Sequence, residues 1–501
     1  MALRTFYQAL LDSDPARLRI MARQWDLDLT SDRPTDMAAE LVDAIANAER
    51  VEWMLDGLPE EQHRALNDLL RNEGAIPWPI FTRRWGEIRA VGAGRVERER
   101  LWTAPHSATE GLWYLGLVQR TFDDRNDLQV EVAFIPEELR LYLPDPPPLP
   151  IPDPPTIPPP TYHQSEEDRL ADDLTILWSE FQNRWGKSER ARWSNLGSSG
   201  SIRFALLRTL SLEQGWLSRE TSDHLHLVAD PVLSWLRADP WAQWVALIEA
   251  WLESRHWNDL QAVPTLNPDP VKGWPNRPAQ ARQAVWEVLS RCDPDGWYTL
   301  DAFADYVKAH ATDFLRPDGD YDAWGLRDAQ TDMPLRGFEA WEDVEGAYLR
   351  FVITCPMHWL GLINLGGETS DTVTAFTLSR AGAALLDLAA PPELTEPAHI
   401  QVDVDGTVLV PRRRRYERFQ LSRVAEVLNW RQGRYRLTPQ SLARAQEQHI
   451  APARIVAFLE EASADPVPEA LRQAIQRAVQ RGETAALSQG WILTVPDAAL
   501  L

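Results

Sequence analysis

A dense group of arginines lies near the C-terminal end of this sequence and is its clearest candidate for binding chemistry. Between residues 411 and 436, nine arginines are opposed only by Glu417 and Glu426. Guanidinium groups suit bidentate contact with phosphate oxygens. Four aromatic residues that could stack on bases or on guanidinium planes interleave with them: Tyr416, Phe419, Trp430 and Tyr435. The pattern predicts contact with nucleic acid, and a solvated helix face balanced by acidic domains is the alternative.

We expect two groups of arginines to contact phosphates. The main group consists of Arg412, Arg413, Arg414, Arg415 and Arg418. A second group surrounds a predicted recognition region nearer the N-terminus and consists of Arg83, Arg84, Arg89, Arg95, Arg98 and Arg100. Because phosphate contacts position a protein without reading bases, we expect weak sequence preference and a steep salt dependence.

The string Trp185-Gly186-Lys187-Ser188 resembles the end of a phosphate-binding loop. Such a loop needs a glycine five positions before Gly186, where this chain has Phe181, and a strand where an amphipathic helix is expected. The sequence also lacks a helicase metal motif, a G-x-S-x-G elbow and an H-E-x-x-H helix. We therefore predict no motor and no enzyme, although an active site assembled from distant residues leaves no local signature.

Three stretches carry metal-ligand side chains without a complete site. The alternating carboxylates of residues 318–322 resemble a calcium loop, but Ala323 and Ala329 replace the glycine and glutamate that an EF-hand needs. Cys355-Pro356-Met357-His358 has no second ligand pair at zinc-site spacing. The histidines of residues 224–226 would form half a site on one strand face. We predict no metal and no cofactor.

The charge of the chain is unevenly distributed. Its 501 residues carry a formal net charge of −23, which argues against coating nucleic acid by bulk electrostatics. Residues 399–501 contain 14 arginines and 11 acidic residues, a net of +3, so residues 1–398 carry −26. Two cysteines exclude a disulfide scaffold. With neither a leader nor an unbroken apolar span, we expect a soluble, cytoplasmic protein without a membrane partner.

Proline-rich segments divide the chain. Residues 144–160 contain 11 prolines in 17 positions and predict an extended polyproline linker; a docking site for an SH3-like partner is the alternative. Residues 263–278 form a second linker. Tryptophan and leucine at helical spacing are expected to form cores.

Periodicity predicts helices at 60–72 and 77–86, a helix from Ser107, and strands at 119–122 and 130–135. Three helices and a two-stranded ribbon are typical of a winged helix. The same order recurs later in the chain. The predicted fold is mainly α with small β-wings, an α+β class, in these parts: a weakly SAP-like helical hairpin at 1–50, winged-helix-like units at 51–143, 161–262 and 279–390, and a small α+β domain at 399–501.

The C-terminal stretch also resembles a known family. HIQVDVDGTVLVPRRRRYERFQLSRVAEV, YRLTPQSLARAQEQHIAPARIVAFLEEAS and PVPEALRQAIQRAVQRG are similar to the helicase-associated domain of bacterial proteins. That domain is itself similar to the N-terminal, damage-recognition-like domain of XPB-type repair helicases. The resemblance implies a module that engages DNA, or positions a helicase on it, in repair or transcription complexes. It does not imply ATPase activity.

The sequence therefore predicts a non-catalytic protein that binds DNA and a protein partner such as a helicase. The alternative is a scaffold of winged helices that binds proteins and no nucleic acid, because a strongly acidic body suits a basic partner. A mimic of DNA is a third possibility, which rests on the acidity alone.

Overall fold

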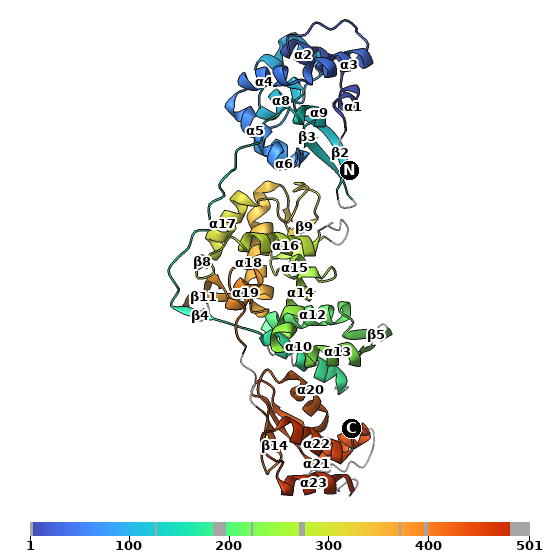
Figure 1. Ribbon diagram of the computed structural model, residues 1–501, viewed down its shortest axis with the longest axis vertical. Coiled ribbons are helices and arrows are strands. Elements are labelled where there is room, and N and C mark those ends of the chain that lie inside the picture. Colours follow the sequence, from blue (N-terminus) through green and yellow to red (C-terminus); the bar gives the residue numbers. More distant parts are fainter. Residues whose placement is uncertain are drawn as a thin grey trace, which may run out of the picture. The chain divides into compact units, whose positions relative to one another are not determined.

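The computed structural model describes residues 4–125, 128–183, 197–221, 224–269, 276–369, 372–394 and 399–480. The chain divides into two compact units: unit 1 consists of Met1–Pro154, Pro264–Val288 and Ala302–Ala347, and unit 2 of Pro155–Val263, Leu289–Asp301 and Tyr348–Leu501. Both combine helices with small antiparallel sheets (Figure 1). The predicted α+β class is confirmed, because both units contain helices and small antiparallel sheets.

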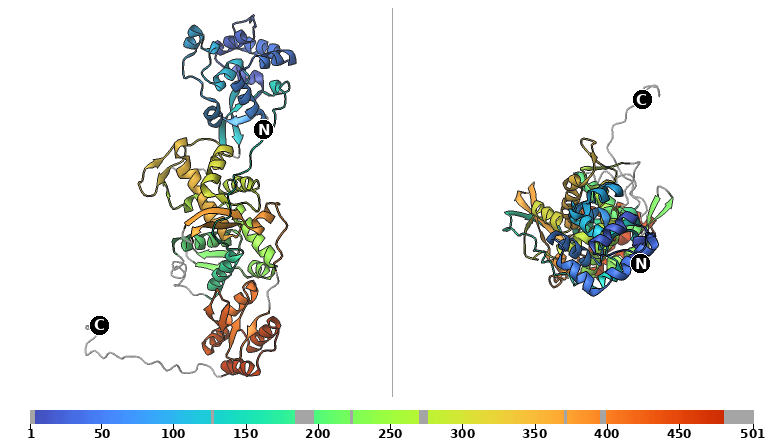
Figure 2. Two further views of the ribbon diagram at one scale, coloured as in Figure 1. Left: turned by 90° about the vertical axis from the view of Figure 1, so that its left-hand side faces the viewer. Right: turned by 90° about the horizontal axis from the view of Figure 1, so that it is seen from above.

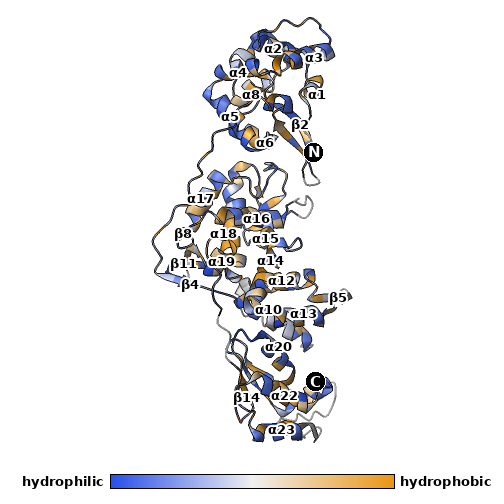
Figure 3. Ribbon diagram, viewed as in Figure 1, coloured by the Kyte–Doolittle hydropathy of each residue, from blue (hydrophilic) through white to orange (hydrophobic). Residues whose placement is uncertain are grey.

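The N-terminal helices of unit 1 share one hydrophobic core with the residues that follow them. The helices are α1 (Phe6–Leu11), α2 (Pro15–Gln24), α3 (Pro34–Ile45) and α4 (Ala48–Asp56). Asp14 caps α2 by accepting a hydrogen bond of 2.7 Å from the Ala16 amide. Polar and apolar residues mix along these helices (Figure 3). Because α4 crosses residue 50 and the core extends from Phe6 to Leu139, the hairpin expected at 1–50 is not a separate body.

The next part of unit 1 has the predicted order of helices and strands. Its elements are α5 (Glu60–Arg71), β1 (Ala75–Pro77), α6 (Trp78–Trp85), α7 (Ala93–Glu99), η1 (Leu101–Thr103), α8 (Ala108–Leu115), β2 (Gln119–Arg125), β3 (Leu128–Phe134) and α9 (Glu137–Arg140). Ser107 caps α8 as expected, with its hydroxyl accepting from the Glu110 amide at 3.0 Å. The three strands form an antiparallel sheet in the order β1-β3-β2.

Unit 1 is completed by residues from the middle of the chain. A three-stranded sheet has the order β10-β9-β7 and consists of β7 (Leu266–Pro268), β9 (Leu326–Asp328) and β10 (Pro334–Leu335). The helices α16 (Pro278–Leu289) and α17 (Leu300–His310) precede β9, and η2 (Phe338–Ala340) and η3 (Glu342–Gly346) follow β10. The division between units therefore falls inside the segment 279–390, which the sequence predicts as one winged-helix-like unit.

A four-stranded sheet of unit 2 repeats the strand order seen in unit 1. It runs β4-β11-β12-β8 and consists of β4 (Tyr162–Gln164), β8 (Tyr298–Thr299), β11 (Ile363–Thr369) and β12 (Thr372–Leu378). A short strand pairs with the second strand of a hairpin in both sheets, β1 with β3 and β8 with β12. Three elements flank this hairpin in the chain: α18 (Ala347–Val352), η4 (Ile353–Met357) and α19 (Arg380–Leu385).

Three tryptophans form the centre of the helical part of unit 2. Trp178, Trp216 and Trp235 meet edge to face, with ring centroids 5.1–6.2 Å apart. They belong to a segment made of α10 (Arg169–Gln182), α12 (Gly197–Glu213), β5 (Leu217–Thr221), β6 (His224–Leu227), α13 (Ala229–Arg237), α14 (Pro240–Glu253) and α15 (Asp259–Ala262). All three rings are buried, so they act as core residues.

The C-terminal segment contains one hairpin that the sequence does not predict. Its elements, red in Figure 2, are β13 (Gln401–Val402), β14 (Thr407–Leu409), α20 (Arg415–Val424), β15 (Glu426–Asn429), β16 (Arg434–Arg436), α21 (Pro439–Glu447), α22 (Pro452–Ala462) and α23 (Glu469–Gln480). The strands form a sheet in the order β13-β14-β16-β15. β15 and β16 have only four and three residues, too few for the alternation by which a strand is recognised. Nowhere in the described chain is a helix long and apolar enough to cross a membrane.

Candidate nucleic-acid interface

The arginines at the start of α20 converge on one buried carboxylate. Asp168, which directly precedes α10, accepts from Arg412 Nη2 at 2.6 Å, from Arg413 Nε at 3.1 Å and from Arg415 Nη2 at 2.6 Å. Asp172, one turn further along α10, accepts from Arg415 Nε at 2.8 Å and from Arg412 Nη1 at 3.2 Å. These five side chains, which we call the Asp168 cluster, join the C-terminal segment to α10 within unit 2.

Ion pairing lowers the pKa of Asp168, and the arginines of the Asp168 cluster are largely buried. Burial opposes ionisation of Asp168, but the positive charges of Arg415 and Arg412 outweigh burial and hold its pKa well below the usual range. Arg415 has no exposed side-chain surface, and its Nη1 donates to Gln243 Oε1 at 2.7 Å. Arg412 and Arg413 retain 29% and 19% exposure. Arg415 therefore presents no guanidinium surface to a phosphate in this structure.

The other two arginines of the main group also serve the fold. Arg414 pairs with Glu417 at 3.1 Å. Arg418 is buried and donates to the backbone oxygens of Arg412 and Trp430. The Trp430 oxygen lies in the turn between β15 and β16, so Arg418 anchors the turn of that hairpin.

Arg83 and Arg84 form ion pairs inside unit 1. Arg83 Nη2 lies 2.5 Å from Asp313 Oδ1, and its guanidinium stands over the rings of Tyr321 and Phe338 at 5.0 and 4.8 Å from their centroids. Arg84 pairs with Asp68 at 3.2 Å and contacts Asp313 at 3.4 Å. Both side chains therefore connect α6 with residues more than 200 positions later in the sequence.

The remaining arginines of the second group differ in exposure. Arg89 pairs with the buried carboxylate of Glu110 at 2.7 Å. Arg95 pairs with Glu99 on the surface of α7 at 3.0 Å. Arg98 and Arg100 are exposed, and no described residue forms an ion pair with them. Within this second group, only Arg98 and Arg100 are both exposed and without a carboxylate partner among the described residues. Such arginines can bind a phosphate without first breaking an ion pair.

The four interleaved aromatic residues do not form an open stacking platform. Phe419 and Tyr435 are buried. Trp430 packs edge to face on Tyr435, with ring centroids 5.7 Å apart, and Tyr416 lies 5.3 Å from the Arg237 guanidinium. Tyr435 and Trp430 belong to the packing of the C-terminal core, whereas Tyr416 contacts a residue of α13.

A basic surface that the sequence did not single out lies on the hairpin of β15 and β16. Arg431 in the turn and Arg434 on β16 are exposed, and no described residue forms an ion pair with either. Gly433 closes the turn with φ of +64°, and a Cβ there would stand 2.0 Å from the Val410 oxygen. The glycine therefore fixes the close approach of this hairpin to β14.

A second pair of cations lies on the same segment. Burial of Arg423 on α20 and the neighbouring charge of Arg454 on α22 lower the pKa of Arg423. Arg423 Nε donates to the neutral Gln448 at 3.2 Å, and Arg454 is exposed. Among the described residues, neither guanidinium has a carboxylate partner, so both can attract an anion.

The C-terminal segment is also where comparison with known proteins gives a result. Residues 400–501 match the family described as helicase conserved C-terminal domain. The match supports a helicase-associated C-terminal domain. It covers about a fifth of the chain and includes β13 to α23. No curated protein matches the chain.

Among the described residues, the other motifs noted in the sequence form no group that could hold a metal ion. His358 Nδ1 lies 2.9 Å from the Ile363 oxygen, and burial lowers its pKa. Cys355 contacts Thr354. The Asp318–Asp322 loop uses Asp320 to accept from its own backbone amides. Residues 185–188 and the side chain of His224 lie outside the described residues, and no three ligand-type side chains group around a cation site among those described.

Proposed function

We propose that this chain is a non-catalytic, helicase-associated protein that engages DNA through its C-terminal segment in repair or transcription complexes. The observation that carries the proposal is the match of residues 400–501 to the helicase C-terminal domain, in a chain whose sequence lacks a phosphate-binding loop. The relation to the damage-recognition-like domain of bacterial and XPB-type proteins belongs to the same proposal. So does the winged-helix assignment, which the repeated strand order supports.

The structure changes which arginines are the best candidates for phosphate contact. Arg412, Arg413, Arg415, Arg83 and Arg84 already hold carboxylates, and releasing them would leave buried acids unpaired. We assign the primary contact instead to the exposed hairpin arginines Arg431 and Arg434, and a secondary one to Arg423 and Arg454 on the same domain. Exposed, unpaired guanidinium groups lose little by exchanging water for a phosphate.

Fluorescence anisotropy with labelled duplex and forked DNA tests this proposal. Binding at low salt is expected to weaken steeply with added salt. The double change Arg431→Glu and Arg434→Glu is expected to abolish two phosphate contacts and reduce the slope of log K against log salt by about two. Arg477→Glu, at an exposed position of α23 on the same domain, is the charge-matched control for the single change Arg431→Glu. Absence of binding at low salt, or equal losses in these two single variants, would overturn the proposal.

A protein-binding scaffold is the second candidate, favoured by the charge of −26 over residues 1–398. Such a body repels DNA and attracts a basic partner. Co-purification with and without nuclease separates the two functions. Protein partners that survive nuclease treatment, with no DNA retained, would support the scaffold, whereas partners lost with the DNA would support the helicase-associated DNA protein.

A further inference from the structure

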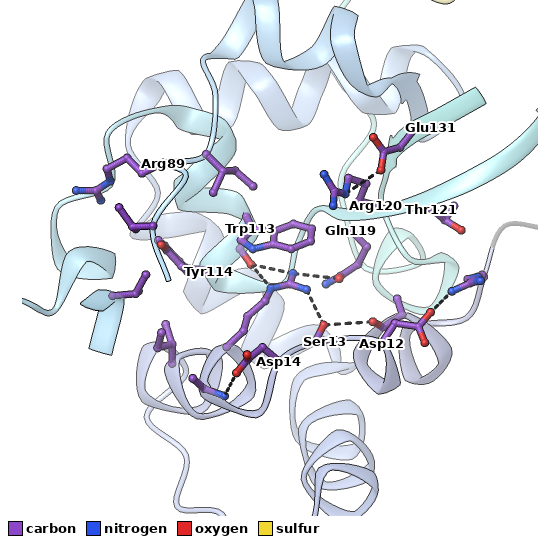
Figure 4. Close-up of a pocket in the computed structure, with 18 of the residues that line it drawn as sticks. Asp12, Ser13, Asp14, Arg89, Trp113, Tyr114, Gln119, Arg120, Thr121 and Glu131 are labelled. Carbon is purple, nitrogen blue, oxygen red and sulfur yellow. Dashed lines mark hydrogen bonds and ion pairs between the residues drawn. The ribbon is translucent and has the colours of Figure 1, made fainter. Parts of the chain in front are cut away.

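Unit 1 contains a pocket of about 590 Å³ that none of the proposed DNA contacts uses. It lies between the α1–α2 turn, the end of α8, the start of β2 and residues 88–96 (Figure 4). Its volume is in the range of small-molecule sites. The wall combines charged side chains with apolar ones, among them Ile20, Val96, Trp113 and Phe122.

A buried arginine without an acidic partner lies in the wall of this pocket. Arg17 is 7% exposed, and its guanidinium stacks on Trp113 at 3.4 Å from the ring centroid. It donates to Ser13 Oγ at 2.7 Å, to Gln119 Oε1 at 3.0 Å and, from two nitrogens, to the Trp113 oxygen at 3.0 and 3.3 Å. All these acceptors are neutral. No described carboxylate forms an ion pair with Arg17.

The surroundings of Arg17 increase the positive potential in the pocket. Burial and the charge of Arg120 lower the pKa of Arg17 to about 9. Arg120 pairs through Nε with Glu131 at 3.0 Å and keeps about half of its side chain exposed. Figure 4 shows Trp113, Gln119 and Arg120 around the same space. Two guanidinium groups, those of Arg17 and Arg120, therefore influence one cavity, and of the two only Arg120 has a carboxylate partner, Glu131.

The other charges in the pocket wall are already engaged. Arg4 pairs with Asp12, and Arg89 pairs with Glu110. Asp14 accepts from the Ala16 amide at the start of α2. Among the described charged residues of this wall, Arg17 alone has neither an ion-pair partner nor a role in capping a helix. A buried cation without a counter-ion is costly, and an incoming anion reduces that cost.

We propose that this pocket binds a small organic anion, a carboxylate or phosphate attached to an apolar group, with Arg17 and Arg120 providing the counter-charge. Charge-assisted hydrogen bonds to guanidinium groups hold the acidic group. The apolar wall takes the remainder of the molecule, and the volume admits a small molecule and excludes a duplex. This site is independent of the DNA contacts assigned to unit 2.

Isothermal titration calorimetry of the full chain with phenyl phosphate, benzoate and inorganic phosphate tests the site. Saturable binding of phenyl phosphate or benzoate is expected, and the tighter of the two identifies the acidic group. Inorganic phosphate is expected to bind at least tenfold more weakly than phenyl phosphate, since it leaves the apolar wall empty. No saturable binding of either organic anion would overturn the proposal, as would displacement of the bound probe by duplex DNA.

Substitutions locate the binding. Arg120→Gln changes a half-exposed side chain and is expected to weaken binding at least tenfold while the circular dichroism spectrum is retained. Arg17→Met keeps the length of the buried side chain and is expected to abolish binding. Arg98→Gln removes an exposed arginine outside the pocket and serves as the matched control. If Arg17→Met does not fold, Arg120→Gln decides, and binding unchanged by Arg120→Gln contradicts the site.

Discussion

Arg415 Nη2 lies 2.6 Å from Asp168 Oδ2, and neither side chain retains exposed surface. The two residues are 247 positions apart in the sequence. Asp168 also accepts from Arg412 and Arg413, so one carboxylate contacts three arginines of the run. The run that sequence analysis assigns to phosphate binding thus stabilises the attachment of the C-terminal segment to α10.

Arg415→Ala is expected to lower the free energy of unfolding by about 3–5 kcal/mol, because it leaves Asp168 and Asp172 buried with one guanidinium fewer. Urea denaturation followed by circular dichroism measures the change. Arg436→Ala is the control, since Arg436 and Asp405 form a surface pair with 44% and 58% exposure, whose loss costs about 1 kcal/mol or less. Equal effects of the two variants would refute a stabilising role for the Asp168 cluster.

The low pKa of Asp168 predicts a loss of stability in acid. Above the ordinary pKa of an aspartate, about 3.9, both folded and unfolded chains carry the ionised carboxylate, and its stabilising effect is fully present. As pH falls through that value, the unfolded chain takes up a proton that the folded chain does not, so unfolding becomes easier. Asp168→Asn is expected to be less stable at pH 7 and to lose less stability between about pH 5 and 3. Parallel pH profiles of variant and parent would contradict this expectation.

Asp313 is expected to stabilise unit 1. Its carboxylate is 9% exposed and accepts from Arg83 at 2.5 Å and from the Tyr321 hydroxyl at 3.0 Å. Asp313→Ala is expected to cost about 1–3 kcal/mol, because buried donors lose their acceptor. Asp332→Ala is the control, since that carboxylate is 78% exposed. Thermal unfolding compares the two variants, and a shift in Asp313→Ala no larger than in the control would count against the role.

Gly433→Ala tests the hairpin that carries Arg431 and Arg434. The left-handed backbone costs a non-glycine residue about 1–2 kcal/mol, and the added Cβ would meet the Val410 oxygen. Reduced thermal stability together with weaker DNA binding is expected. Gly92→Ala is the control, as no atom lies within 4 Å of the Cβ that it adds. If the Gly433→Ala protein is destabilised but binds DNA as tightly as the parent, the hairpin does not carry the DNA contact.

Elements with local signals were predictable from the sequence. The helix at Glu60–Arg71 follows its apolar periodicity, and Ser107 caps α8 because a serine hydroxyl reaches the amide three residues on. The β15–β16 hairpin was missed, since its strands have only four and three residues, too few for an alternation of polar and apolar residues to stand out. Sequence reasoning could have distinguished the exposed Arg431 and Arg434 from the other arginines of the run only if it had predicted this hairpin.

The sequence by itself determined the uneven charge, the absence of a phosphate-binding loop and the helicase-related character of the C-terminal segment, because each depends on composition or on residues close together in the chain. Only the tertiary structure decided which arginines are free. An ion pair depends on distance in space, and Asp168 and Asp313 are each more than 200 positions from the arginines that they neutralise. Charge density along a sequence shows where cations are, and folding decides whether they face a carboxylate or the solvent.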